Sequence, residues 1–132
     1  MPDRSLPRSE RLRSLGAVRR LFEEGESGFV FPFRYVWLAE PDNAAGPAEV
    51  LFSVPKKFHK RANKRNLLRR RTKEAYRLRK AILGLENRPS GLDIALIYST
   101  KEILPYSRIE QAVCRVLETI AGKLSDGAEQ RN

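Results

Sequence analysis

The chain has 132 residues, 41% of them hydrophobic, which suits one globular domain and is too apolar for a disordered chain. Its 26 basic and 16 acidic residues give a net charge of +10, which indicates a polyanionic partner, either a nucleic acid or an anionic membrane surface. The single cysteine, Cys114, excludes an internal disulfide and a cysteine-based zinc site.

The chain ends differ in composition from the middle. We expect residues 9–124 to form one domain, with flexible tails at residues 1–8 and 125–132, which are polar. No apolar run is long enough to cross a bilayer, and the first residues lack the apolar core of a signal peptide. The sequence therefore predicts a cytoplasmic protein without a membrane partner.

Apolar spacing predicts a first helix over residues 9–24, which Gly25 ends. Aromatic and β-branched residues then predict a strand over residues 29–38, with Pro32 at an edge or a bulge. Alternation along this strand gives one face with Phe29, Phe31, Phe33, Tyr35 and Trp37, and another with Val30, Arg34, Val36 and Leu38.

The remaining elements follow a turn-rich loop at residues 41–47. We expect a strand at 49–54, a long helix at 62–83, a connection at 84–91 and a fully buried strand at 92–99. A last helix is expected after Pro105 to about Lys123, with an inward stripe of Ile109, Val113, Val116 or Leu117, and Ile120. The order is helix, two or three strands, helix, strand, helix.

The positive charge is concentrated in residues 56–80, which we call the basic segment. It holds 13 basic residues and one acid, Glu74, so it carries +12 while the rest of the chain carries −2. Like charges at helical spacing destabilise a free helix, so this segment is suited to a surface that phosphates neutralise.

The helix within the basic segment has two predicted sides. Leu68, Thr72, Ala75, Leu78 and Ile82 form an apolar stripe that should dock on the sheet. The adjoining row holds Arg65, Arg69, Lys73 and Lys80, with Tyr76 among them. We therefore expect a basic rod anchored along one side, with Lys56, Lys57 and Lys60 near its start.

Charge alone leaves several partners open. A ribosomal or other structural RNA-binding protein with a similar βαβ core is the main alternative, and a DNA-binding or membrane-surface protein is another. The acids are scattered, so we expect no catalytic residues and no metal bound by protein side chains. His59, the single histidine, is expected to cap the basic helix or to contact phosphate.

Two stretches resemble a known family. Phe52-Ser-Val-Pro-Lys-Lys57 and Arg61-Ala-Asn-Lys-Arg-Asn-Leu-Leu-Arg-Arg-Arg-Thr-Lys-Glu-Ala-Tyr76 are similar to the bacterial ribonuclease P protein component. That family has a strand ending in a Lys-Lys pair, followed by an Arg-Asn-Arg signature helix. Arg65 and Asn66 match the first two signature positions, whereas Leu67 stands where the family has its third, an arginine.

The resemblance implies an α/β sandwich like the second domain of ribosomal protein S5, with a mixed sheet, a central basic helix and a left-handed βαβ crossover. It implies an accessory subunit of an endoribonuclease (a hydrolase), whose partners are the catalytic RNA and precursor tRNA. The protein would bind that RNA and the 5′ leader, and the RNA subunit with magnesium would cut the leader off. No cofactor would be bound by protein side chains.

The resemblance also implies the site residues. The residues expected to bind RNA lie in the basic segment: Lys56, Lys57, Lys60, Arg61, Lys64, Arg65, Asn66, Arg69, Arg70, Lys73 and Arg77. The residues expected at the leader cleft lie on the first helix and the first strand: Val18, Phe22, Tyr35, Val36 and Trp37.

Overall fold

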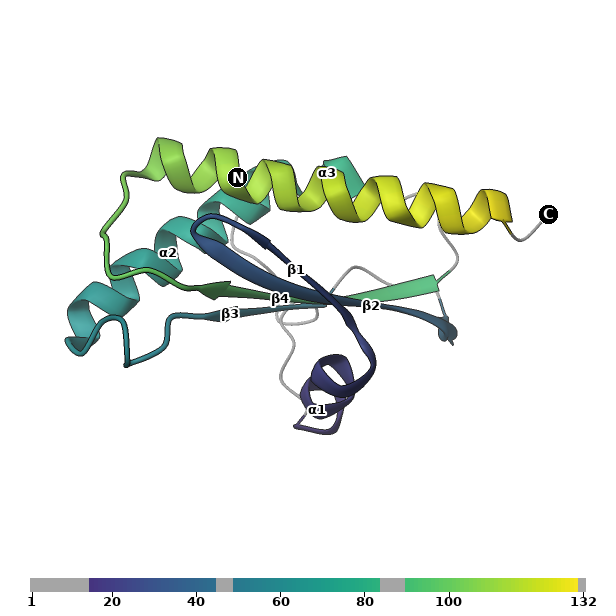
Figure 1. The fold of residues 1–132 in the computed structure, drawn as a ribbon, viewed down its shortest axis with the longest axis horizontal. Helices are drawn as coiled ribbons and strands as arrows, with labels where there is room; N and C mark the ends of the chain where they lie inside the picture. Colours follow the sequence, from purple (N-terminus) through teal and green to yellow (C-terminus); the bar gives the residue numbers. More distant parts are fainter. Residues whose placement is uncertain (1–14, 45–48, 84–89, 131–132) are drawn as a thin grey trace, which may run out of the picture.

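The structure is a computed structural model that describes residues 15–44, 49–83 and 90–130. It contains one four-stranded sheet with helices on both faces (Figure 1). The elements are α1 (Leu15–Glu24), β1 (Glu26–Val30), β2 (Phe33–Ala44), β3 (Glu49–Ser53), α2 (Ala62–Arg79), the 3-10 turn η2 (Lys80–Leu83), β4 (Ser90–Tyr98) and α3 (Tyr106–Gln130). This α+β fold has the mixed sheet that the resemblance implies.

The strands lie in the order β1-β2-β4-β3. β1 and β4 each pair antiparallel with β2, while β3 and β4 are parallel neighbours. Parallel neighbours need a crossover connection, and α2 provides it. The expected βαβ unit is therefore present, and it delivers the chain from the end of β3 directly into the basic segment.

Each face of the sheet has its own helical layer (Figure 1). α2 and α3 cover one face, where the main core gathers around β2 and β4 residues such as Phe33, Tyr35 and Ile94. α1 covers part of the other face, where Leu21 packs on Val36 and Ala95. Because successive strand residues point to opposite faces, one strand supplies both cores.

The predicted first strand is two strands. Phe31 and Pro32 form a two-residue turn between β1 and β2, because Val30 pairs with Phe33, and the Phe31–Pro32 peptide bond is cis. Pro32 has no N–H to donate to a ladder, so it suits this turn, and its carbonyl accepts a hydrogen bond from Ser99 N (2.8 Å). Pro32 therefore lies in a hairpin turn between two strands, and not at a bulge within one strand.

The helix boundaries are confirmed in part. α2 begins at Ala62 and the helical path ends at Leu83, as predicted, although its last four residues are a 3-10 turn. α3 continues to Gln130, about seven residues past its expected end, so much of the predicted C-terminal tail is helical. Residues 1–14, including the predicted N-terminal tail, lie outside the described residues. Within the described ranges, no helix combines the length and apolar character that a membrane span requires.

Candidate nucleic-acid interface

The candidate interface begins in the connection between β3 and α2. The backbone N–H groups of Phe58 and His59 both donate to the Pro55 carbonyl, at 3.2 and 3.3 Å, which closes a turn after the strand. The turn leaves Lys56 and Lys57 exposed, and the Lys57 ammonium lies 5.0 Å from the centre of the Phe58 ring. The predicted Lys-Lys pair therefore lies at the surface immediately before α2.

Arg65 fastens this connection to the helix. Its Nη1 donates to the carbonyl of Lys60 at 2.7 Å and to that of His59 at 3.1 Å. Arg61 precedes the helix in an extended conformation and provides no side-chain cap. Arg65 thus uses part of its guanidinium to hold the entry to α2, and its side chain is half-buried rather than fully presented.

His59 has a different place from the one expected. Its side chain is buried, and Nε2 lies 2.8 Å from the Thr100 carbonyl, to which it donates, so that it joins the β3–α2 connection to the loop after β4. Its ring also lies 5.7 Å from that of Tyr98. The expectation of a helix cap or a phosphate contact at His59 is wrong, because its ring points into the protein.

The inner side of α2 packs much as predicted. Leu68, Thr72 and Ala75 are buried, and Thr72 Oγ1 donates to the Leu68 carbonyl at 2.8 Å. Tyr76 belongs to this side too, because its ring is 1% exposed and packs edge-on against Phe52 at 5.8 Å. The prediction that Tyr76 lies in the basic row is therefore wrong.

Leu78 is the opposite case, because the predicted apolar stripe includes it and the structure places it outside. It was expected inside, yet it is 49% exposed, while Ile82 is half-buried against the core and Leu83 is buried. The buried positions of α2 are Leu68, Thr72, Ala75 and Tyr76. At 3.6 residues per turn, Leu78 lies about a quarter turn away from the centre of that side, on the edge opposite Tyr76.

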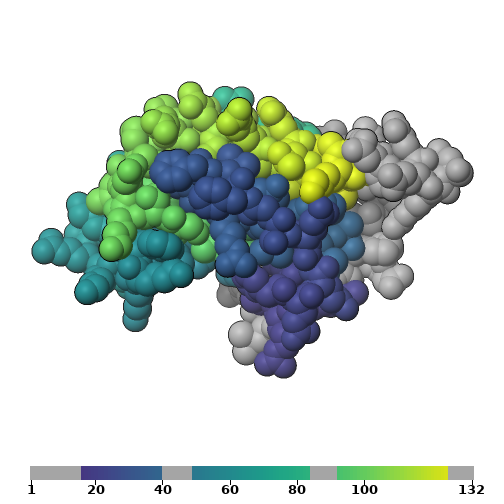
Figure 2. Space-filling model, in the orientation of Figure 1, coloured from purple at the N-terminus to yellow at the C-terminus, as the bar shows by residue number. Residues whose placement is uncertain are grey.

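The outer side of α2 carries the polar residues. Asn66 and Arg70 are exposed, four residues apart, and Arg69 Nη1 donates to Asn66 Oδ1 at 3.2 Å. All eleven predicted RNA-binding residues are exposed or half-buried: Lys56, Lys57, Lys60, Arg61, Asn66 and Arg70 are exposed, and Lys64, Arg65, Arg69, Lys73 and Arg77 are half-buried. Figure 2 shows this part of the chain (teal) protruding at one end of the molecule.

Arg77 and Lys73, both in the second half of α2, also interact with other side chains of the protein. Arg77 forms two hydrogen bonds with Glu74, and these are the main reason that the pKa of the Arg77 guanidinium is raised. The Lys73 ammonium lies 6.0 Å from the centre of the Phe52 ring, at the side of α2 that faces β3. The part of α2 that is most open to a large anion is therefore its first half.

The off-pattern signature residue, Leu67, lies on the flank of α2 nearer α3. Four residues later, Arg71 lies on the same flank, and its Nη1 donates to the Leu104 carbonyl at 2.7 Å. Arg71 therefore ties α2 to the loop before α3. No sequence signal marks Arg71 as a structural residue.

The five predicted leader-cleft residues fall on two faces of the sheet. Val18 and Phe22 lie on α1, and Val36 of β2 faces that helix. Tyr35 and Trp37 face the other way and are buried in the core beneath α2 and α3. The structure therefore brings Val18, Phe22 and Val36 together and separates them from Tyr35 and Trp37, because neighbouring strand residues alternate between faces.

One further residue belongs to the α1 side of the sheet. Arg34 of β2 is exposed and stands two residues from Val36, on the same face. The period-two alternation of the sequence already placed Arg34 and Val36 together, so the signal was available. Figure 2 shows α1 (purple) and the part of the chain that includes α2 (teal) as two separate projections of the molecule.

Among residues 15–44, 49–83 and 90–130, no group of three or more His, Cys, Asp or Glu side chains could hold a metal ion.

Comparisons with known proteins agree with this architecture. The family model for Ribonuclease P matches residues 6–132. A "Ribonuclease P protein component" of Porphyromonas gingivalis is 34% identical over 125 residues, which are 93% of this chain and 91% of the relative. The solved RNase P protein of Thermotoga maritima has a TM-score of 0.68 at 25% identity, covering 84% of this chain and 97% of that one. The Staphylococcus aureus RNase P protein has the same fold, with a TM-score of 0.66 at 17% identity, covering 85% and 95%.

Proposed function

Because this chain belongs to the ribonuclease P protein family, and so is a protein component of that endoribonuclease, we propose that the exposed side of α2 binds the catalytic RNA. The observation that carries this proposal is the two-sided character of α2. Leu68 and Tyr76 fix the helix to the core, while Asn66 and Arg70 stand exposed on its outer side. A fixed cationic helix presents its charges to phosphates without first having to be ordered.

We further propose that the RNA subunit, with magnesium, cleaves precursor tRNA and that this chain supplies binding. The groups on α2 are guanidinium, ammonium and amide groups, which pair with phosphate oxygens. Guanidinium groups stay protonated at neutral pH and so hold a phosphate rather than take a proton from water. Binding would position the substrate for removal of the 5′ leader, giving the mature 5′ end of the tRNA.

The leader is assigned to the α1 side of the sheet. Phe22 is 45% exposed and offers an aromatic surface for an unpaired base, with Val18 beside it on α1. Arg34 is an exposed cation on the same side of the sheet, suited to the leader backbone.

Reconstitution tests the proposal. The full chain is mixed with a cognate catalytic RNA, and cleavage of precursor tRNA is followed over a magnesium titration. We expect the protein to lower the magnesium concentration needed for half-maximal cleavage. If that concentration is unchanged while the chain co-sediments with ribosomal subunits, the chain is a structural RNA-binding protein and the proposal is wrong.

A pair of matched variants tests the α2 assignment. Arg70→Ala removes an exposed cation of α2, and Arg19→Ala removes an exposed cation of α1 on the opposite side of the sheet. Affinity for the catalytic RNA alone should fall by about 1–3 kcal/mol in Arg70→Ala and stay unchanged in Arg19→Ala. Equal losses in both variants would mean that binding is spread over the surface without a preferred helix.

A further inference from the structure

We propose that this chain has a second binding surface for single-stranded RNA, in a groove between the β1–β2 hairpin and α3. The groove has a volume of about 770 Å³, within the usual range of pockets that hold a small organic ligand. Its walls come from Phe29, Val30 and Phe31 on one side and Arg108, Gln111 and Arg115 on the other. The lining also includes Arg79, Glu110, Ala112 and Cys114. Of all these residues only Arg79 belongs to the basic segment, and none belongs to the predicted leader cleft.

Phe31 gives the groove an exposed aromatic ring, and Phe29 lies at its rim. Phe29 is 58% exposed and Phe31 is 45% exposed, at the end of β1 and in the turn that follows. Neither ring contributes to either hydrophobic core of the described structure. The short turn holds Phe31 at the edge of the sheet beside the groove. The register pairs Phe29 with Arg34, so the Phe29 side chain lies on the α1 face of β1 and reaches only the rim of the groove. Such rings provide stacking surfaces for bases that are not paired in a duplex.

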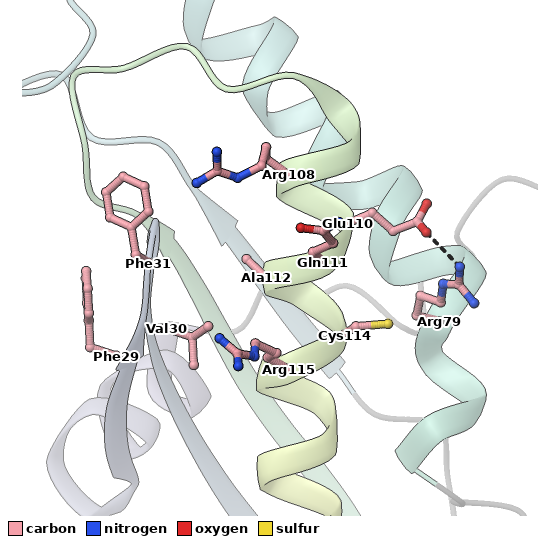
Figure 3. A pocket seen from close by; sticks show the side chains of 10 residues that line it. All are labelled: Phe29, Val30, Phe31, Arg79, Arg108, Glu110, Gln111, Ala112, Cys114 and Arg115. Atoms are coloured by element: carbon pink, nitrogen blue, oxygen red, sulfur yellow. Dashed lines mark hydrogen bonds and ion pairs between the residues drawn. The ribbon is translucent and has the colours of Figure 1, made fainter.

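Two arginines give the groove its charge. Arg108 and Arg115 are exposed on α3 and lie seven residues apart, which is two helical turns or about 10.5 Å along the axis. Figure 3 shows both guanidinium groups directed from α3 toward β1, with Gln111 and Ala112 between them. Neither arginine pairs with a carboxylate of the described residues. Both are therefore available to phosphate oxygens.

The carboxylates around the groove are neutralised or lie beyond it. Glu110 binds Arg79 at 2.6 Å on the α2 side of α3, and this hydrogen bond lowers the pKa of the Glu110 carboxyl. Glu26 of β1 pairs with Lys123. The next carboxylate along this side of α3 is Glu118, one turn past Arg115 and outside the lining. The groove thus presents a net positive field next to aromatic rings.

An exposed aromatic surface beside two arginines is suited to single-stranded RNA. A duplex keeps its bases stacked on one another, so it would leave Phe31 unused, whereas a single strand offers bases and phosphates together. The groove lies at the β1 edge of the sheet, while β3 forms the opposite edge and leads into α2. RNA held here would therefore contact the protein at a place distinct from the exposed first half of α2, and of α2 only its last residue, Arg79, borders the groove.

Binding of the full chain to a fluorescent single-stranded oligoribonucleotide tests the groove. Phe31→Ala should raise Kd about fivefold or more, because one base loses its stacking partner, and Phe31→Trp should retain binding. Replacing both Arg108 and Arg115 with Gln should reduce the slope of log Kobs against log salt by about 1.4, since two phosphates lose their partners. A circular dichroism melt verifies that each variant is folded.

Matched controls come from the loop between β4 and α3. Ile103→Ala removes an apolar side chain that is 44% exposed, and Lys101→Gln removes an exposed cation, both outside the groove. These two variants should bind like the unaltered chain. If the groove variants bind as tightly as the controls, or if the controls lose equally, no RNA site exists in the groove.

The outcome is separable from the function proposed for α2. The groove substitutions should keep their effect in an Arg70→Ala background, so failure of α2 as an RNA-binding helix would leave the groove result intact. To identify which RNA occupies the groove, the measurement is repeated with precursor tRNAs of different leader length and with the catalytic RNA alone. A loss confined to long leaders assigns the groove to the leader, and a loss with the catalytic RNA assigns it to that subunit.

Discussion

Individual arginines of the basic segment differ in what their side chains do. Arg70 is exposed on the outer side of α2, whereas Arg65 donates to two backbone carbonyls and Arg71 to the Leu104 carbonyl. The guanidinium has five N–H donors, so a residue such as Arg65 can hold the backbone and still offer donors to a phosphate. A count of charges treats these residues as equal, and their hydrogen bonds show that they are not.

Arg65→Ala should therefore weaken both folding and RNA binding. Loss of the two hydrogen bonds to His59 and Lys60 should lower the free energy of unfolding by about 1–2 kcal/mol. Urea denaturation measures this change, and Arg70→Ala is the control because it should leave stability within about 0.5 kcal/mol. Equal stability of the two variants would mean that the contacts of Arg65 do not hold the connection.

Tyr106 gives a prediction for alkaline pH. Burial, followed by the nearby Glu110 carboxylate, raises the pKa of the Tyr106 hydroxyl from 10.0 to about 12. The folded state then holds the proton more tightly than the unfolded state, so this contribution to stability is complete below pH 10 and is lost as pH rises toward about 12. The free energy of unfolding should fall less over this window in Tyr106→Phe than in the unaltered chain. Parallel pH profiles for the two proteins would contradict the prediction.

At the scale of elements, Gly25 shows why α1 lies close to the sheet. Its N–H donates to the Leu21 carbonyl at 2.8 Å, as a helix end requires. A Cβ at this position would also meet Val36 Cγ1 at 2.8 Å and the Trp37 carbonyl at 2.9 Å. Glycine is therefore needed for space between α1 and β2, in addition to ending the helix as the sequence predicts.

Gly25→Ala should lower the free energy of unfolding by about 1–3 kcal/mol through overpacking. Gly122→Ala is the matched control, because a Cβ on that exposed part of α3 meets nothing within 4 Å. The control should gain about 0.5–1 kcal/mol from helix propensity. Denaturant unfolding of both variants checks the pair, and a stabilised Gly25→Ala would show that α1 can move away from β2 freely.

Phe22→Ala tests the α1 side of the sheet as the leader surface. Because the ring is 45% exposed, its removal should affect folding far less than removal of a core aromatic. Affinity for precursor tRNA in the reconstituted complex should fall by about 1–3 kcal/mol, the usual value of one stacked base, while affinity for mature tRNA stays unchanged. Equal losses for both tRNAs in a folded variant would rule out the assignment.

At the scale of the whole molecule, the charge is segregated. The basic segment carries +12 on a chain whose total is +10, and α2 displays its exposed part at one end of the fold (Figure 2). Such a distribution orients the protein toward a polyanion and leaves the remaining surface close to neutral.

RNA affinity of the whole chain should therefore depend steeply on salt. Log Kobs should fall linearly with log salt, by about 0.7 per phosphate for single strands and about 0.9 for a duplex. Arg70→Ala should reduce the slope by about 1, and Arg19→Ala should not change it. Titration from low to high potassium chloride measures the slopes, and a nearly flat dependence would contradict a role for the basic segment in binding phosphates.

The sequence by itself determined the order of the elements, the anchored side of α2 and the concentration of charge. These properties are local, because periodicity and composition along ten to twenty residues set them. Alternation in β2 also separated Val36 from Tyr35 and Trp37, yet the cleft expected from the family placed the three together. The structure decided the matter by covering one face with α1 and the other with α2 and α3.

Only the tertiary structure decided which polar groups stay available. His59 reaches Thr100 across 41 residues and Arg71 reaches Leu104 across 33, and contacts at such separations leave no local pattern in the sequence. The same holds for the groove between the hairpin and α3, whose walls are brought together by the fold. Local spacing predicts which residues share one helix face or strand face, whereas long-range packing decides whether that face meets solvent, a carbonyl or another side chain.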